Sequence, residues 1–242
     1  MNIRSLIMTG VSRLVCLSLV FVLVSWPGLA GAASLFGDLD QFKAEGTITA
    51  KDFTDRRISF EINKGRLEGT VLAENFNNRQ IRLSFTPSSI KGAMSSLNIS
   101  DRIIDFRVKE NHIMGQVTAD GFQPRLLDLI FRDQLIEGTC SVKEYATRHI
   151  RIELEANNAL GLVTAEEYNR RELKLAAHDG VIEGTITAKN SSDRHVYLKV
   201  SRADSEGMKM VLFFLLLDMR IYRSYLGKYH TTLNLNTNIN LP

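Results

Sequence analysis

The chain has 242 residues, of which 44% are hydrophobic and 24% are charged, and its formal net charge is +3. The first 33 residues hold two arginines and no acid, so the remainder carries 28 basic and 27 acidic residues. A segment this close to neutrality lacks the clustered basic face of a nucleic-acid-binding protein, and we expect no nucleic-acid partner. Only one cysteine, Cys140, follows residue 33, which excludes an intramolecular disulfide after that point.

Residues 1–33 are predicted to be an export signal. Two arginines precede an apolar run at residues 14–25, and small residues follow it, so cleavage is expected near Ala32 or Ala33. The apolar run is shorter than the roughly 20 residues that span a membrane. An uncleaved N-terminal anchor is the alternative. We therefore expect an exported protein that resides in the periplasm or outside the cell.

From residue 46 onward the sequence repeats every 23 residues without an insertion. Each unit opens with a glycine and has the skeleton of residues 69–91, GTVLAENFNNRQIRLSFTPSSIK. The seven opening glycines are Gly46, Gly69, Gly92, Gly115, Gly138, Gly161 and Gly184. Gly207 falls at the next multiple of the period. A fixed period of this length is typical of a repeat architecture. The predicted organisation is a signal at 1–33, a lead-in or cap at 34–45, the repeat domain at 46–206, and a divergent cap or tail at 207–242.

Each unit alternates apolar and polar residues in two stretches. With the glycine as place 1, aliphatic residues recur at places 3, 13, 15 and 17, and polar residues lie between them. An aliphatic residue shortly before the next glycine, such as Leu67 or Leu160, is assigned to the same face. Alternation with a period of two is the mark of a strand with one buried face. Each unit is therefore predicted to contain two strands of about seven residues.

Short turn-forming segments separate these strands. Lys64-Gly65 and Asp179-Gly180 tolerate positive φ and suit the tight turns of antiparallel hairpins. Pro87 and Pro124 are both expected in turns, where they remove no ladder hydrogen bond. The predicted fold is all-β, with seven tandem 23-residue β-hairpins in an antiparallel meander that forms a curled sheet, a barrel or a sandwich. A β-solenoid with parallel stacked strands is the alternative.

The C-terminal tail departs from the repeat. Residues 210–217, MVLFFLLL, are apolar without alternation. Three interpretations remain open: a cap over the last strand edge, an interfacial membrane anchor, or a segment foreign to the repeat. The anchor would use the basic and tyrosine residues that follow, namely Arg220, Tyr222, Arg223, Tyr225, Lys228 and Tyr229. Membrane association is thus expected through this tail, and self-association through free sheet edges.

An arginine stands at place 11 of every unit. The seven are Arg56, Arg79, Arg102, Arg125, Arg148, Arg171 and Arg194. In a meander they would line one rim, about 10 Å apart. Guanidinium groups in such a row bind the phosphates or carboxylates of an anionic polymer or lipid. The alternative is a structural role, in which each arginine bonds turn carbonyls or pairs with a carboxylate such as Asp55 or the place-23 Glu68.

Other candidate chemistry is weaker. An aromatic residue recurs at place 8 and is expected to pack the strand ends, with a stacking platform as the alternative; it is Phe53, Phe76, Phe122, Tyr145 or Tyr168. The histidines occupy scattered places and form no metal-ligand pair. The sequence has no phosphate-binding glycine loop and no nucleophile elbow. We expect no catalytic residue, no metal, no cofactor and no enzymatic activity.

Two segments resemble known families. The sequence RLEG at residues 66–69 is similar to part of the MORN motif, but every unit lacks the Tyr-x-Gly core of that family, so no family is assigned. The spacing of VLAENF at 71–76 and IRL at 81–83 resembles the strands of periplasmic lipid-bridge proteins, which use a curled sheet with an apolar trough.

The expected function is that of an exported, non-enzymatic scaffold, either structural or binding. A regular repeated surface more often binds than catalyses. Its expected partner is an anionic polymer, a lipid or a protein of the cell envelope. The resemblance to lipid-bridge proteins implies the alternative, a protein that binds or bridges lipids or other amphiphiles through the apolar face of the sheet.

Overall fold

The computed structural model describes residues 35–36, 41–51, 53–73, 78–97, 99–165, 168–188 and 191–217. The helix α2 (Ser205–Leu217) follows fourteen strands. The strands are β1 (Gln41–Ala50), β2 (Phe53–Asn63), β3 (Arg66–Ala73), β4 (Arg79–Thr86), β5 (Ser89–Ser96), β6 (Ile99–Lys109), β7 (His112–Ala119), β8 (Phe122–Phe131), β9 (Leu135–Val142), β10 (Arg148–Glu155), β11 (Asn158–Ala165), β12 (Tyr168–His178), β13 (Val181–Ala188) and β14 (Ser191–Val200).

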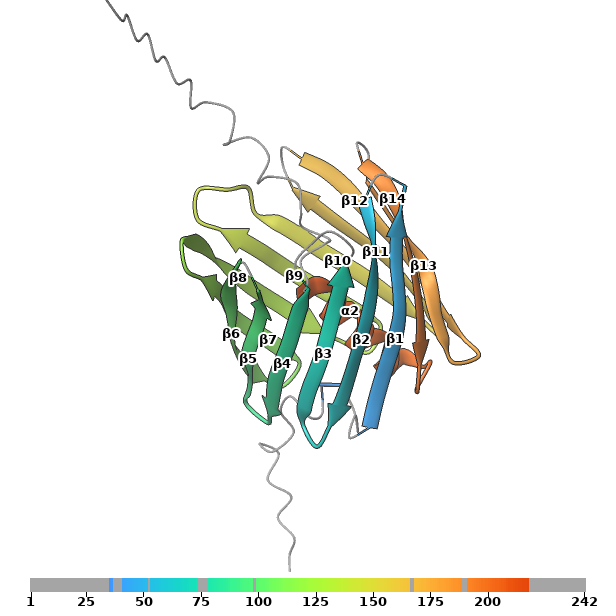
Figure 1. Ribbon diagram of the computed structural model, residues 1–242. Helices are drawn as coiled ribbons and strands as arrows, with labels where there is room; N and C mark the ends of the chain where they lie inside the picture. The colour runs from blue at the N-terminus through green and yellow to red at the C-terminus, as the bar shows by residue number, and fades with distance from the viewer. Residues whose placement is uncertain are drawn as a thin grey trace, which may run out of the picture.

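The strands form a closed antiparallel barrel (Figure 1). Each strand pairs with its neighbours in sequence, and β14 pairs with β1. The predicted meander is confirmed, and a barrel is the form it takes. The solenoid alternative is wrong, because equivalent strands would then stack in parallel. Closure also leaves no unpaired edge among the fourteen described strands, so the edges expected to support self-association are occupied within the chain itself.

The units join one another with a constant register. Gly69 lies opposite Phe60, which joins place 1 of one unit to place 15 of the unit before it. At the barrel closure Gly46 lies opposite Leu198, the same two places. Within its own unit Gly46 lies opposite Ile58, at place 13. The register therefore advances by two residues per unit, which is the stagger that tilts strands in a barrel.

The turns follow the sequence prediction except at one proline. Lys64-Gly65 and Asp179-Gly180 have positive φ at both residues, as a type I′ hairpin turn requires. Pro87 lies in a turn, as predicted. The prediction for Pro124 is wrong, because this residue lies inside β8. The pairing of β7 with β8 is irregular at that point, and such a bulge accommodates a residue that cannot donate a backbone hydrogen bond.

The apolar face of every strand points into the barrel. On β2, for example, Ile58, Phe60 and Ile62 are buried while the residues between them are exposed. The assignment of Leu160 to this face is wrong, since Leu160 is 48% exposed and Ala159 is fully buried. Ala159 stands two residues before Gly161 and so shares its parity. The rest of the alternating pattern places the aliphatic residues as predicted.

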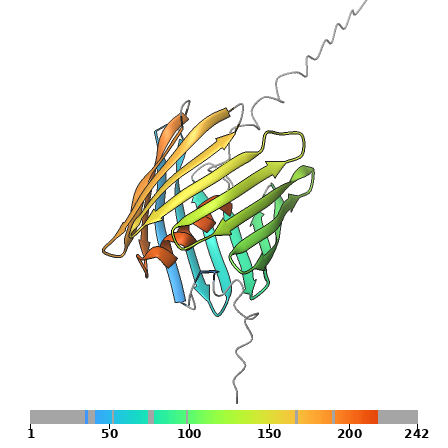
Figure 2. The same cartoon turned by 180° about the vertical axis from the view of Figure 1, so that it is seen from behind.

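The helix α2 runs through the lumen (Figures 1 and 2). Residues 207–217 are all buried. A helix that is apolar on every side needs apolar surroundings on every side. Opposite backbones of a barrel with fourteen strands are about 25 Å apart, which leaves room for the wall side chains and one helix. The inner face of the barrel is therefore enclosed and filled by the chain's own C-terminal segment.

Aromatic residues anchor α2 to the wall. Phe214 stacks on Phe60 of β2, with ring centroids 4.3 Å apart and an interplanar angle of 9°. Phe213 lies 5.2 Å from Phe36, centroid to centroid, and also contacts Phe85 of β4 and Phe131 of β8. These contacts reach opposite parts of the barrel wall. They fix both the depth and the rotation of the helix in the lumen.

The start of α2 is specified by a polar cap. The Oδ1 atom of Asp204 accepts a hydrogen bond from the Gly207 backbone amide at 3.0 Å, and Arg202 donates to the same carboxylate. Burial alone would raise the pKa of Asp204, but these hydrogen bonds and the Arg202 charge together lower it. A Cβ atom on Gly207 would lie 2.0 Å from the Arg202 carbonyl oxygen, so glycine is needed where the chain enters the lumen.

Residues 210–217 thus cover the inner face of the barrel and not a strand edge, because the edge of β14 is already paired with β1. The predicted anchor residues at 220–229 and the predicted signal at 1–33 lie outside the described residues. No helix in the described part of the chain is long and apolar enough to cross a membrane.

Candidate anion-binding rim

The seven place-11 arginines lie at a single rim of the barrel and have the parity of the inner face. Each stands two residues before the buried aliphatic residue at place 13, as Arg56 stands before Ile58. Six of the arginines are half-buried, and Arg171 is only 7% exposed. We call this end the arginine rim. The turns from odd-numbered to even-numbered strands form it, at the top of Figure 1.

Small residues make room for these side chains. Each arginine lies directly opposite place 5 of the following unit, and that place holds Ala, Ser or Val. The pairs are Arg56 with Ala73, Arg79 with Ser96, Arg102 with Ala119, Arg125 with Val142, Arg148 with Ala165, Arg171 with Ala188, and Arg194 with Ala50. The last pair crosses the barrel closure. A guanidinium group beside a short neighbour can extend over the mouth of the lumen.

The positive charges at this rim affect one another. The pKa of Arg171 is lowered to about 10, first by burial and then by the charges of Arg194 and Arg148 in the neighbouring units. Burial also lowers the pKa of Arg79. All seven arginines interact with other groups of the chain. An anion at the rim would therefore join an existing polar network, and its charge would offset the repulsion among the guanidinium groups.

The glutamates at place 23 are candidate partners of these arginines. In the strands, Glu137 and Glu183 each follow a buried isoleucine, so their side chains lie on the outer face of the barrel and not on the arginine face. Glu137 pairs with Arg132 at 2.9 Å, and Glu183 contacts His178 at 3.1 Å. Glu206, at the start of α2, pairs with the buried Lys209 at 3.0 Å. Within the described residues, no three His, Cys, Asp or Glu side chains come together as a metal site. Three of the place-23 glutamates therefore have partners other than the rim arginines.

Cys140 lies just inside the arginine rim. Its thiol is buried, and burial raises its pKa, although the charges of Arg125 and Arg148 partly counteract this effect. We expect the thiol of the folded protein to react with Ellman's reagent at least tenfold more slowly than that of the urea-unfolded chain, because the thiolate is the reactive form. A folded protein that reacts as fast as the unfolded one would contradict this placement.

The place-8 aromatic residues do not follow the prediction where they are described. Phe122 is 51% exposed and Tyr145 is exposed to a similar extent, so neither packs the strand ends in the interior. The side chains of Phe53, Phe76 and Tyr168 lie outside the described part of the structure. Phe122 is the first residue of β8, and Tyr145 lies in the connection between β9 and β10, so both are at the arginine rim. Among the described residues, the rim therefore combines inward arginines with two exposed aromatic residues, Phe122 and Tyr145.

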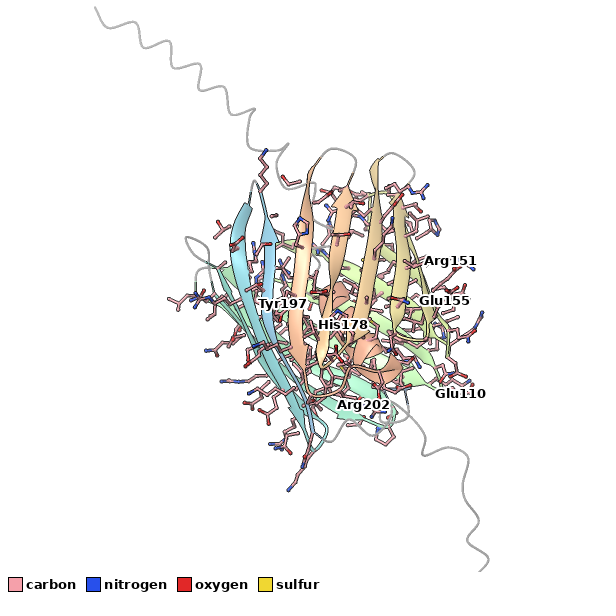
Figure 3. All side chains as sticks on the ribbon, turned by 90° about the vertical axis from the view of Figure 1, so that its right-hand side faces the viewer. Glu110, Arg151, Glu155, His178, Tyr197 and Arg202 are labelled. Carbon is pink, nitrogen blue, oxygen red and sulfur yellow. The ribbon has the colours of Figure 1, made fainter. Side chains whose placement is uncertain are left out.

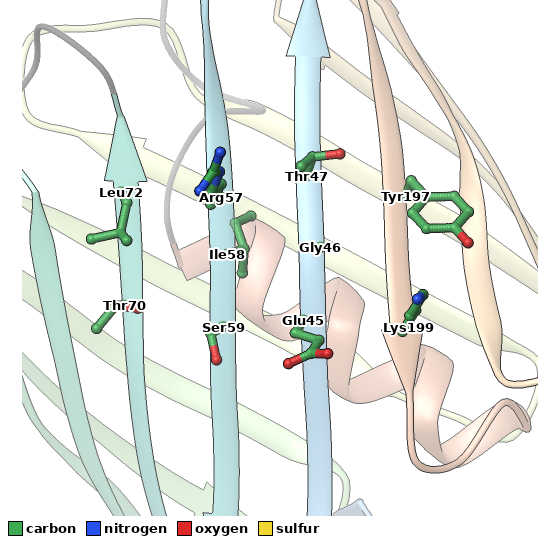
Figure 4. A pocket seen from close by; sticks show the side chains of 10 residues that line it. All are labelled: Glu45, Gly46, Thr47, Arg57, Ile58, Ser59, Thr70, Leu72, Tyr197 and Lys199. Atoms are coloured by element: carbon green, nitrogen blue, oxygen red, sulfur yellow. The ribbon is translucent and has the colours of Figure 1, made fainter.

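The outer wall is charged and carries a shallow groove. Arg151 and Glu155 lie on this wall (Figure 3). The groove, of about 460 Å³, crosses β14, β1, β2 and β3 (Figure 4). Its floor includes Gly46, and Tyr197 and Leu72 lie at its two sides. Sequence reasoning did not find this groove. The one signal was Tyr197 itself, since the other units have Ser, Arg, Asp or Lys at that place.

Sequence reasoning placed the arginines at one rim but did not determine which way they face. Because places 11, 13 and 15 are two residues apart in the same strand, the arginines face the same side as the buried aliphatic residues. No family model matches the chain, and no curated protein or solved structure shows significant similarity to it.

Proposed function

We propose that this chain is an exported, non-enzymatic binding scaffold whose arginine rim takes phosphate or carboxylate groups of an anionic ligand. The observation that carries the proposal is that all seven place-11 arginines converge on one mouth of a closed barrel. Seven guanidinium groups form a multivalent donor set, and charge-assisted hydrogen bonds to anions are the strongest that side chains make. The N-terminal pattern supports export, and the ligand is a polymer, a lipid or an envelope protein.

The alternative function, transport or bridging of lipids along the apolar face, is less well supported by this geometry. The inner face is enclosed by the barrel, and α2 fills it. An acyl chain could enter the lumen only after α2 had left, which would expose the buried residues 207–217 to water. We therefore favour ligand binding at the rim over ligand binding in the lumen.

Binding of inorganic polyphosphate, measured by isothermal titration calorimetry, tests the proposed function. Replacing Arg148, Arg171 and Arg194 together by Gln should weaken binding at least a hundredfold, or about 2.7 kcal/mol. Each charge-assisted contact contributes roughly 1.5–3 kcal/mol, and the four remaining arginines offset part of the loss. The affinity of the unmodified protein should also fall as salt is added, since salt screens the contributing charges.

A matched variant provides the control. Arg82, Arg107 and Arg151 are exposed and lie on the outer wall, so their replacement by Gln removes the same charge from the protein but leaves the rim intact. This variant should bind polyphosphate within about threefold of the unmodified protein, as expected for exposed charges at a distance. Equal weakening in both triple variants would mean that net charge and not the rim carries binding.

A further inference from the structure

The two rims of the barrel expose different side chains. Among the described side chains of the arginine rim, five large apolar residues from three consecutive units are at least half exposed, and we call them the rim patch: Leu97, Ile103, Phe122, Leu126 and Tyr145. The turns of the opposite rim are polar where the structure describes them, as at Glu110-Asn111, Asp133-Gln134 and Asp179-Gly180. None of those turn residues is a large exposed hydrophobic residue. In the strands next to that rim, Leu160 is 48% exposed and Met114 is 36% exposed, so the two rims differ in their turn residues and in the number of exposed apolar side chains.

The rim patch extends over neighbouring strands, with the polar Gln116 and Thr118 of β7 between two of its members. Ile103 of β6 lies opposite Thr118, and Leu126 of β8 lies opposite Gln116, so both flank β7 on the outer face. Phe122 lies at the end of the same pairing, beside Ala119. Leu97, in the turn after β5, is 92% exposed. Single exposed hydrophobic residues are common on proteins, but a group of them at one end marks a contact surface.

We infer that the arginine rim docks on the surface of a lipid bilayer that contains anionic lipids. The arginines would meet the phosphates of the head groups, and the rim patch would enter the boundary between head groups and acyl chains. Basic residues beside aromatic and aliphatic ones are the combination by which proteins bind such surfaces without crossing them. This inference rests on the proposed function and names the lipid as the source of the anion.

Acidic residues at the same rim set the balance of charge. Asp101, Asp120 and Glu144 lie in or next to the turns of the rim patch and are exposed. Their charges oppose approach to an anionic surface. The exposed Lys51 and Lys143 lie in turns of the same rim, so the attraction comes from these lysines, from the arginine ring and from burial of the patch. Neutralising one of these carboxylates should therefore strengthen docking, whereas neutralising a carboxylate at the opposite rim should have no effect.

Vesicle co-sedimentation tests the inference. The full chain should bind vesicles of phosphatidylcholine mixed with phosphatidylglycerol and should not bind vesicles of phosphatidylcholine alone. Replacing Phe122 and Leu126 together by Ser should reduce partitioning onto the anionic vesicles at least tenfold, because two apolar side chains lose their burial. The affinity of this variant for soluble polyphosphate should stay unchanged, since neither side chain is an anion donor.

The charge variants give the direction of approach. Asp120→Asn should raise the partition coefficient on anionic vesicles by about threefold, from removal of one repulsive charge near the surface, and Asp133→Asn at the opposite rim should leave it unchanged. Binding to polyphosphate without binding to anionic vesicles would overturn the inference while the proposed function stood. Normal partitioning of the Phe122→Ser, Leu126→Ser variant onto anionic vesicles would also overturn the inference. So would a variant that loses only self-association, because that result would identify the rim patch as a protein interface.

Discussion

Replacing Gly138 by Ala should destabilise the barrel by about 3–5 kcal/mol, from strain at a positive φ and from overpacking against a neighbouring strand. Gly138 lies in β9 with φ at 151°, and a Cβ atom there would lie 1.9 Å from the carbonyl oxygen of Asp128 in β8. The clashing atom belongs to the backbone of a paired strand. It can move only if the ladder between β8 and β9 opens.

The matched control is Gly121→Ala. Gly121 also has a positive φ, 76°, but no atom lies within 4 Å of the Cβ position. This substitution should cost only about 1 kcal/mol, the ordinary penalty for an L-residue in this conformation. Urea denaturation followed by circular dichroism measures both values. Equal losses in the two variants would mean that close packing of the strands at Gly138 contributes nothing to stability.

Replacing Phe214 by Ala should destabilise the protein by about 3–5 kcal/mol. Phe214 is fully buried in the lumen and stacks on Phe60. Truncation would remove the stacked ring and leave a cavity between the helix and the wall. The barrel strands are held by their own ladder and cannot collapse inward to fill it, so the loss should lie at the upper end of that range.

Phe122→Ala is the control for this second substitution. It removes the same ring from a half-exposed position at the arginine rim, and the expected loss is within about 0.5 kcal/mol. A double-mutant cycle with Phe60→Ala should show a coupling energy of at least about 0.5 kcal/mol, because the two rings are in direct contact. If Phe214→Ala unfolds at the same urea concentration as Phe122→Ala, then α2 is not packed against the wall.

Much of the barrel could be predicted from the alternation of residues within one unit. Places 3, 13 and 15 point inward throughout, and the turns at Lys64-Gly65 and Asp179-Gly180 have the predicted φ values. The error at Leu160 came from counting: the inward residue stands two places before the glycine, and in that unit it is Ala159. The alternation does not distinguish a barrel from a sandwich. That choice depends on whether β14 meets β1 in register, which no local pattern encodes.

The helix and the rim show two different limits of sequence reasoning. Residues 210–217 are apolar at every position, and a short continuous apolar run does not distinguish a buried helix from a buried strand. Every strand of the barrel wall is already paired on both sides, so a strand in the lumen would have unpaired backbone groups. A helix forms its own backbone hydrogen bonds and can therefore occupy the lumen. The position of the arginines was predicted from the period alone. Their small partners at place 5 emerge only from the register, because they belong to the following unit.

The identical junction at every unit, including the one between the last unit and the first, limits how this protein can change in length. An open array of repeats can gain or lose a copy at its end and keep its shape. Here an added 23-residue copy would widen the ring by two strands and leave empty space around α2, whereas a lost copy would narrow it until the helix no longer fitted. The number of units is therefore matched to the diameter of the C-terminal helix.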